Sequence, residues 1–292
     1  MRASLAASVL AALLFSGAAL ATPTFPAAVS AVEPPASDQD YLQSAVDNPR
    51  RQPQNKARDR WRHPVESLTF WGIRPGDVIL ELDPGGGYWT EVLGAFARST
   101  DGRYIGALPD PRDPKDNDEQ RRNRERFLAR FGDSSAWGRM ETASFGPSSG
   151  PLTAPGAVDF ILTGRNIHNF MWRSMLDKVL ADSFAALRPG GVLAIEEHRA
   201  DPRPMVADAR DGYVSEAFVI AAANKAGFML AGRSEINANP RDSKDHPFGV
   251  WTLPPTRASA APGQPPNPSF DHARYDAIGE SDCMTLKFVK PG

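Results

Sequence analysis

Short apolar runs alternate along this chain with segments whose apolar residues return every three or four positions. The short runs are bounded by Gly, Pro and charged residues, which is typical of buried strands. Six strands are predicted, at residues 78–82, 103–108, 140–145, 158–163, 192–196 and 228–232. Helical spacing is found at residues 63–70, 89–98, 119–131, 175–187 and 213–226. This alternation predicts an α/β fold with a mostly parallel sheet covered on both faces.

The C-terminal part of the chain breaks this alternation. Residues 235–281 contain two proline-rich stretches, at 254–255 and 262–268, and we expect an irregular cap over the active face there. Residues 284–289 then alternate apolar and polar side chains, which predicts a last strand. We expect that strand to add antiparallel to the sixth strand.

The first 21 residues have the pattern of a secretory signal peptide. Arg2 supplies the positive charge, residues 5–14 are apolar, and small residues at 19–21 form a cleavage site. The apolar stretch is too short for a stable membrane anchor. We therefore expect an exported protein, periplasmic or secreted after cleavage near Ala21.

Composition narrows the possibilities further. We expect residues 22–45 to be a flexible leader, beginning with a Pro- and Ala-rich stretch, and residues 46–292 to form one domain. Cys283 is the only cysteine, which excludes an intramolecular disulfide and a cysteine-based zinc site. The 33 basic residues do not outnumber the 35 acidic ones, so nothing predicts binding to nucleic acid.

The most informative stretch is the glycine-rich turn that follows the first predicted strand. The strand contains Glu81 and is followed by Asp83, Pro84 and the glycines at 85–87, and then by a predicted helix. Glycines allow a tight turn and a close approach of the backbone to a ligand, and the helix directs its first amides at the same place. This turn predicts a ligand site.

Polar residues follow three other predicted strands, where ligands bind in open α/β sheets. We expect them to converge on one pocket with the glycine turn. They are Arg165, Asn166, His168 and Asn169 after the fourth strand, Glu197, His198 and Arg199 after the fifth, and Glu235, Asn237, Asn239, Arg241, Asp242 and His246 after the sixth.

His168 is the best candidate for a general base, with Glu197 placed to fix its tautomer. Asn166 and His198 complete the predicted catalytic set. Guanidinium groups suit a carboxylate or phosphate, and an indole ring suits stacking, so we also predict substrate contacts. The predicted substrate-binding residues are Arg165, Asn169, Arg199, Asn237 and Trp251.

From about Pro64 to Lys290 the chain resembles the class I S-adenosylmethionine (SAM)-dependent methyltransferases. The similar features are Pro75-Gly76, the acidic glycine turn, Asp159 in the fourth strand and Leu187-Arg188-Pro189-Gly190-Gly191. More narrowly, it is similar to an exported bacterial branch with blocks like Arg165-Asn166-Ile167-His168-Asn169, Glu197-His198-Arg199 and Ile278-Gly279-Glu280-Ser281-Asp282. The resemblance implies methyl transfer from SAM to a small-molecule acceptor. The cofactor-binding residues it implies are Glu81, Asp83, Gly85, Gly86, Gly87, Asp110 and Asp159.

The chain departs from that family's pattern at three places, one of which is the third strand, where no adenine-side acid is evident near Ser144-Phe145. Asp83 stands at the first glycine position, where its carboxylate either pairs with the sulfonium or amino group of the cofactor or excludes the cofactor's carboxylate. An acid that accepts hydrogen bonds from the ribose commonly ends the second strand, and here Asp110 would have to replace it.

Two alternatives remain open on sequence grounds. His168, His198 and Glu197, with His246, are residue types that bind zinc or iron, so the chain is also compatible with a metal-dependent enzyme. A ligand-binding module that keeps the fold without catalysis is the other alternative.

Overall fold

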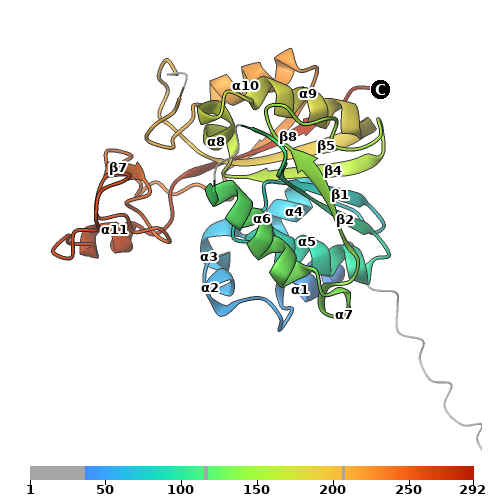
Figure 1. Ribbon diagram of the computed structural model, residues 1–292, viewed down its shortest axis with the longest axis horizontal. Coiled ribbons are helices and arrows are strands. Elements are labelled where there is room, and N and C mark those ends of the chain that lie inside the picture. The colour runs from blue at the N-terminus through green and yellow to red at the C-terminus, as the bar shows by residue number, and fades with distance from the viewer. Residues whose placement is uncertain (1–36, 115–117, 206–207) are drawn as a thin grey trace, which may run out of the picture. The chain divides into compact units, whose positions relative to one another are not determined.

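The computed structural model describes residues 37–114, 118–205 and 208–292, which contain a seven-stranded sheet (Figure 1). The strand order is β3-β2-β1-β4-β5-β8-β6. The strands are β1 (Val78–Leu82), β2 (Arg103–Pro109), β3 (Met140–Phe145), β4 (Val158–Gly164), β5 (Leu187–His198), β6 (Met229–Ser234) and β8 (Cys283–Val289). The predicted signal peptide and residues 22–36 of the predicted leader lie outside the described residues.

The directions of the strands confirm the predicted fold class. Strands β1 to β5 pair parallel to one another, and β8 pairs antiparallel with both β5 and β6. The last strand therefore lies between the fifth and the sixth, and it alone runs against the other strands of this sheet. The fold is a mostly parallel, Rossmann-like α/β sheet with an antiparallel last strand.

Helices cover both faces of the sheet (Figure 1). One face packs against α1 (Asp38–Val46), α4 (Pro64–Trp71), α5 (Tyr88–Ser99), α6 (Asp118–Phe131) and α7 (Ser134–Trp137). The other packs against α8 (Ile167–Trp172), α9 (Leu176–Ala186) and α10 (Glu216–Lys225). Two short helices, α2 (Pro53–Lys56) and α3 (Asp59–Arg62), precede α4.

Neighbouring residues of the central strands pack on opposite sides of the sheet. In β1, Ile79 is buried in one core cluster and Leu80 in the other. In β4, Phe160 and Ile161 divide in the same way. Side chains alternate along a strand, so a strand covered on both faces needs apolar residues at consecutive positions. This is why these strands could be recognised in the sequence as continuous apolar runs.

The folded part begins earlier than predicted. Residues 38–45, expected to belong to a flexible leader, form all but the last residue of α1, in which Leu42, Ala45 and Val46 are buried. The Ser37 hydroxyl caps this helix by accepting the backbone N–H of Asp40, and the Asp40 carboxylate accepts the backbone N–H of Ser37. Three apolar residues on one face and a capping box are enough to dock a short helix whose average composition is polar.

The segment between β6 and β8 is mostly irregular and contains only β7 (Pro247–Val250) and α11 (Ala273–Ile278). Buried side chains hold it together. Asn239 donates to the carbonyl oxygens of Ile278 and Glu280, and Asp242 accepts a hydrogen bond from the backbone of Asp282. Within the described ranges, no helix has both the length and the hydropathy that crossing a bilayer requires.

Candidate functional site

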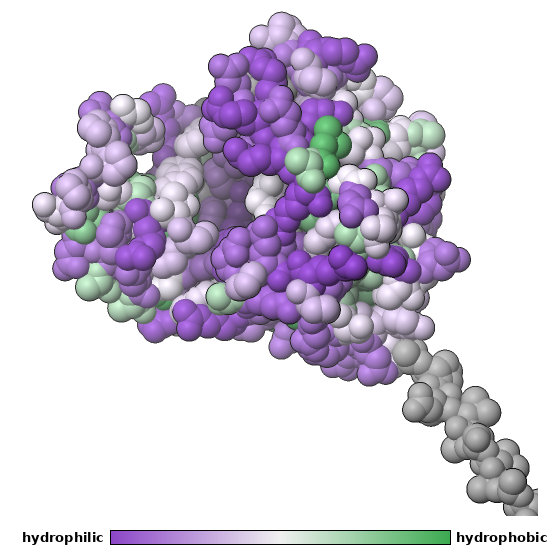
Figure 2. All heavy atoms as spheres, turned by 60° about the horizontal axis from the view of Figure 1, so that its bottom comes forward, coloured by the Kyte–Doolittle hydropathy of each residue, from purple (hydrophilic) through white to green (hydrophobic). Residues whose placement is uncertain are grey.

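A pocket of about 260 Å³ opens where the carboxyl ends of β1, β4 and β5 meet. Figure 2 shows the surface hollowed between the C-terminal segment, at the left, and the rest of the molecule. Ten of the predicted site residues line the pocket: Glu81, Asp83, Gly85, Gly86, Arg165, Asn166, His168, Asn169, His198 and Trp251. The chain also contributes residues that were not predicted: Arg58, Arg62, Tyr88, Thr256 and Ser281.

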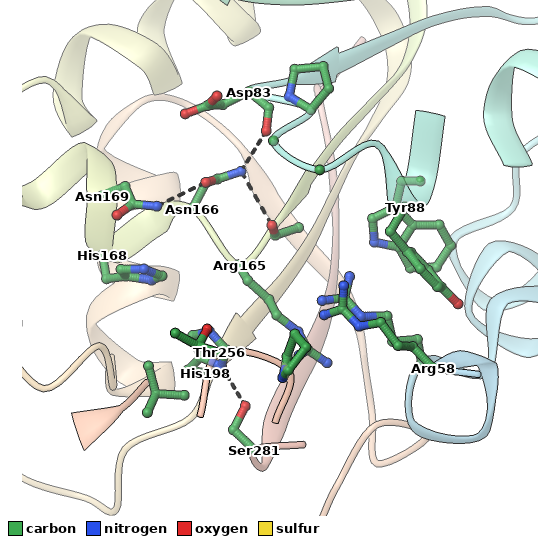
Figure 3. A pocket seen from close by; sticks show the side chains of 18 of the residues that line it. Arg58, Asp83, Tyr88, Arg165, Asn166, His168, Asn169, His198, Thr256 and Ser281 are labelled. Carbon is green, nitrogen blue, oxygen red and sulfur yellow. Dashed lines mark hydrogen bonds between the residues drawn. The ribbon is translucent and has the colours of Figure 1, made fainter. Parts of the chain in front are cut away.

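The glycine turn leaves its backbone open to the pocket. Asp83 and Gly85 have positive φ values of 49° and 54°. A Cβ atom added to Gly86 would meet nothing within 4 Å, and one added to Gly85 would meet only a carbonyl oxygen at 3.9 Å. The side-chain amide of Asn166 donates to the carbonyl oxygen of Asp83 at 3.0 Å, which joins the turn to the end of β4 (Figure 3).

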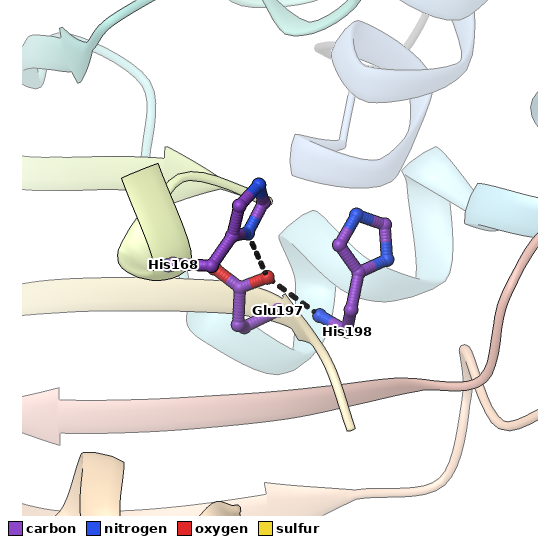
Figure 4. Close-up of side chains that lie close together, drawn as sticks. All are labelled: His168, Glu197 and His198. Carbon is purple, nitrogen blue, oxygen red and sulfur yellow. Dashed lines mark hydrogen bonds and ion pairs between the residues drawn. The ribbon is translucent and has the colours of Figure 1, made fainter. Parts of the chain in front are cut away.

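Glu197 organises the first turn of α8 and one imidazole (Figure 4). Its buried carboxylate accepts the backbone N–H of Ile167, and its Oε1 accepts the backbone N–H of His198 at 2.8 Å. The same Oε1 lies 2.9 Å from Nδ1 of His168. An ionised carboxylate only accepts hydrogen bonds, so Nδ1 carries the hydrogen and Nε2 keeps a lone pair for the pocket. This is the arrangement that the sequence predicted for a general base.

The second histidine of the pocket is held neutral. The Nδ1 of His198 hydrogen-bonds to the hydroxyl of Ser281, and its ring centroid lies 5.3 Å from that of His168. Burial lowers the pKa of His198 well below its usual value, and the positive charge of Arg165 lowers it further. A neutral imidazole suits His198 to orienting a ligand rather than to neutralising an anion.

Three arginines and two glutamates form a buried ion network beneath the pocket. Arg165 donates through Nε to Glu196 at 2.8 Å and also pairs with Glu280. Glu280 accepts from Arg58 and Arg62 as well. Burial favours the neutral acid, but the three arginines hold the pKa of Glu280 well below its usual range. The Nη2 of Arg165 is buried without a hydrogen-bond partner in the described part of the chain.

Glu81 is buried in a different setting. Its carboxyl group accepts hydrogen bonds from the hydroxyls of Tyr104 and Thr90, the latter at 2.8 Å. Burial raises the pKa of Glu81 to about 7, against the lowering effect of these two hydrogen bonds. Glu81 therefore changes its charge near neutral pH, directly below the glycine turn.

Two tryptophans flank His168 on the side of the C-terminal segment. The rings of Trp172 and Trp251 stack with centroids 5.1 Å apart and an interplanar angle of 27°. Each packs edge-to-face with the imidazole of His168, with ring centroids 5.9 and 5.8 Å apart. The predicted stacking platform is thus a pair of rings beside the candidate base.

The structure places Asp159 at the wrong edge of the sheet for cofactor binding. It is the second residue of β4, whose carboxyl end forms the pocket. Its side chain accepts the backbone N–H of Val78, the first residue of β1, at 2.8 Å and pairs with Arg188. Asp159 therefore joins the amino ends of two parallel strands, and its predicted cofactor role is wrong.

Two predicted substrate contacts are engaged in structural bonds instead. Arg199 pairs with Glu235 at 2.7 Å and with Asp282 at 2.9 Å. Asn237 is buried and donates to the hydroxyls of Ser67 and Thr285. Neither residue lines the pocket, so in this arrangement neither would contact a substrate bound there.

Two of the residues implied for the cofactor are also outside the pocket wall. Asp110 follows β2 at the correct edge of the sheet, but its carboxylate accepts from the backbone and guanidinium of Arg112. Gly87 is the N-cap of α5 with φ of 77°, and a Cβ atom there would lie 2.7 Å from the ring of Phe131. Gly87 allows the turn and the close packing of α6, and it does not line the pocket.

The fold brings three of the four suggested metal ligands together. Single ligand atoms of His168, Glu197 and His198 lie within 4.8 Å of one another. His246 is elsewhere, with Nε2 bonded to Asp242 at 2.7 Å. The Glu197 oxygens already accept backbone and imidazole N–H groups, and the positive charge of Arg165, His198's neighbour, opposes a cation. The geometry therefore favours hydrogen-bond chemistry over metal binding here.

Arg58 and Arg62 were not predicted as site residues. They are spaced four residues apart in a polar, partly helical segment, which places them on one side of a helical turn. Glu280 lies in the sequence block Ile278-Gly279-Glu280-Ser281-Asp282, but no functional role was predicted for it. The sequence shows that these residues are charged, and the bend that brings α3 beside residue 280 is a tertiary feature.

Comparisons with known proteins give structural similarity only. No protein-family model and no curated protein matches the chain. A SAM-dependent methyltransferase from Aquifex aeolicus is 17% identical, covering 69% of this chain and 94% of that one, with a TM-score of 0.48. The [4+2]-cyclase SpnF is 14% identical, covering 79% and 82%, also with a TM-score of 0.48.

A third similar structure is the 1,6-didemethyltoxoflavin-N1-methyltransferase of Burkholderia thailandensis, solved with 1,6-didemethyltoxoflavin and S-adenosylhomocysteine bound. It is 12% identical, and the match covers 87% of this chain and 80% of that chain, with a TM-score of 0.44. The functional assignment below therefore depends on the geometry of the site.

Proposed function

We propose that this protein is a SAM-dependent methyltransferase of the class I type that acts on a small-molecule acceptor outside the cytoplasm. One observation carries the proposal. The open backbone of Gly85 and Gly86 and the imidazole of His168 face the same pocket at the carboxyl edge of the sheet. That is where this type of sheet binds its ligands.

The residues of the pocket fit the methionine end of SAM. The turn offers backbone at Gly86 with no side chain above it. The buried and unpartnered Nη2 of Arg165 supplies a donor for a carboxylate, and an unpaired donor of this kind is stabilised by a ligand that accepts its hydrogen bond. Asp83 lines the same pocket and supplies a carboxylate for the ammonium group. Of the two roles open to Asp83, these surroundings favour pairing with the cofactor over its exclusion.

When bound, SAM supplies an electrophilic methyl group on a sulfonium. The chain's own contribution is to align the acceptor and remove its proton. Glu197 fixes hydrogen on Nδ1 of His168, which leaves Nε2 to accept the proton of a hydroxyl or N–H nucleophile. Asn166 and Asn169 are hydrogen-bonded to each other at 3.0 Å and hold the adjacent wall (Figure 3).

The N-terminal sequence supports a location outside the cytoplasm. Residues 1–21 have the charge, apolar run and small-residue site of a signal peptide. We propose that the mature chain begins at Thr22 and works in the periplasm or outside the cell, as in the exported bacterial branch. N-terminal sequencing of the protein from an osmotic-shock fraction tests this. A first residue of Met1 would contradict it.

Calorimetric titration of SAM and then S-adenosylhomocysteine into residues 22–292 tests the cofactor. We expect micromolar binding of both. Gly86→Val places a side chain above the turn at a position where an added Cβ atom meets nothing within 4 Å, so it should abolish binding. Gly150→Val is the matched control, because a Cβ atom there also meets nothing within 4 Å and Gly150 does not line the pocket. No binding by the wild-type chain, or equal binding by Gly86→Val, would overturn the proposal.

A further inference from the structure

A second hollow adjoins the candidate cofactor pocket. Its volume is about 940 Å³, and the C-terminal segment supplies most of its wall. Trp251 and Thr256 line both hollows. Aromatic, proline and alanine residues form much of the second wall, including Phe248 and Pro262. Asp208, Arg210 and Asp211 add charged groups to this wall. A concave, mainly apolar space that also offers some polar groups is the usual setting for an organic ligand.

Trp172 gives this hollow an available aromatic surface. It lies at the end of α8 and stacks on Trp251, yet 43% of its surface is exposed. An indole half exposed beside a hollow is a favourable site for a flat ring, because stacking adds to the burial of apolar area. The same pair of tryptophans packs edge-to-face with His168, so a ring bound here lies close to the candidate base.

His246 lines the hollow, and its imidazole is fully buried there. Its Nε2 lies 2.7 Å from Asp242, whose carboxylate also accepts the hydroxyl of Tyr213 at 3.0 Å. The carboxylate therefore fixes the hydrogen on Nε2 and leaves a lone pair on Nδ1. Nδ1 is buried and has no hydrogen-bond partner in the described part of the chain. A buried acceptor of this kind is stabilised by a ligand that donates an O–H or N–H.

We propose that this second hollow is the recognition subsite for the methyl acceptor, and that it binds a flat aromatic group carrying a hydroxyl or ring N–H. The ring packs against Trp172, the donor reaches His246, and the reacting end of the acceptor extends past Trp251 to His168. The use of this subsite by a methyl acceptor rests on the proposed function. Binding of the aromatic group does not, because it involves none of the residues of the glycine turn.

The test is calorimetric titration of 2-naphthol into the protein without SAM. The wild-type chain should bind it, and Trp172→Ala should raise the Kd about tenfold through the loss of stacking. Leu128→Ala is the matched control. Leu128 is also a large apolar residue with 43% of its surface exposed, but it lies on α6 and lines neither hollow. The Kd of Leu128→Ala for 2-naphthol should equal that of the wild-type chain.

Two further ligands avoid any dependence on the folding of a variant. 2-Methoxynaphthalene lacks the donor for His246 and should bind roughly tenfold more weakly than 2-naphthol. cis-2-Decalol keeps the hydroxyl but is not flat and should also bind roughly tenfold more weakly. Equal binding of either ligand, unchanged binding of 2-naphthol to Trp172→Ala, or no binding to the wild-type chain would overturn the inference. Failure of SAM to bind while 2-naphthol binds would overturn the proposed function alone.

Discussion

Nδ1 of His168 lies 2.9 Å from Oε1 of Glu197, and this contact decides which nitrogen of the imidazole is available to a ligand. Glu197 is held in place by backbone N–H groups from α8 and from the end of β5. The tautomer of His168 is therefore set by the junction of two secondary-structure elements. Chemistry at the pocket depends on that junction.

The first prediction concerns this tautomer. In a long-range ¹H–¹⁵N spectrum of the wild-type chain, His168 should show a protonated Nδ1 and an unprotonated Nε2. Glu197→Gln removes the negative acceptor and should lower methyl transfer at least about a hundredfold, because a positioned base contributes on that order. SAM affinity should change little, since Glu197 does not line the pocket. An Nε2-protonated His168 in the wild-type spectrum would contradict the assignment of the base.

The second prediction concerns the pH dependence of stability. Burial raises the pKa of Glu81 to about 7 in the folded chain, from a model-peptide value of 4.5. The folded state therefore binds the proton more tightly, so the contribution is full below pH 4.5 and is lost as pH rises to about 7. This protonation contributes about 3 kcal/mol to the free energy of unfolding. Glu81→Gln should remove this pH dependence in urea unfolding measured between pH 4.5 and 8. Identical slopes for the two proteins would contradict it.

The third prediction separates packing from backbone strain at the glycine turn. Gly87 and Gly76 both have positive φ, 77° and 85°, so Ala at either position is strained. Only Gly87 has a neighbour in the way, the ring of Phe131 at 2.7 Å from an added Cβ atom. Gly87→Ala should lower the free energy of unfolding by about 1–3 kcal/mol more than Gly76→Ala does. Equal losses in urea denaturation would show that Phe131 moves aside freely.

The fourth prediction concerns the ion network below the pocket. Glu280 is buried and pairs with Arg58, Arg62 and Arg165, so Glu280→Gln leaves buried positive charge uncompensated. We expect a loss of about 3–5 kcal/mol in the free energy of unfolding at pH 7. Glu235→Gln is the control. Its partner is also an arginine, but 68% of its side chain is exposed, so the loss should stay below about 1 kcal/mol.

The difference in the free energy of unfolding between the wild-type chain and Glu280→Gln should shrink as the pH is lowered. The folded-state pKa of Glu280 is lowered, so its contribution is present above the unfolded value near 4.5 and is lost as pH falls below it. Unfolding of the wild-type chain and of Glu280→Gln at pH 7 and at pH 3 measures this. A difference that stays constant between these pH values would contradict the assigned ionisation.

Much of the site could be predicted because it follows strand ends directly. Asn166 and His168 come within a few residues of β4, and Glu197 and His198 end β5, so a parallel sheet brings them to one edge. The predicted cofactor role of Asp159 was wrong for the same geometric reason. It lies at the start of its strand, and the resemblance that suggested a role took no account of the strand's direction.

The sequence by itself determined the order of strands and helices, the glycine turn and the His168–Glu197 pair. The first two follow from periodicity and turn residues, and the pair follows from its place at the carboxyl ends of two neighbouring parallel strands. The tertiary structure alone decided that β8 enters between β5 and β6. This insertion places Glu280 and Ser281 beside Arg165 and His198, and it orders the segment that holds Trp251 and His246. Pairings between residues a hundred positions apart depend on packing of the whole chain, and no local pattern encodes them.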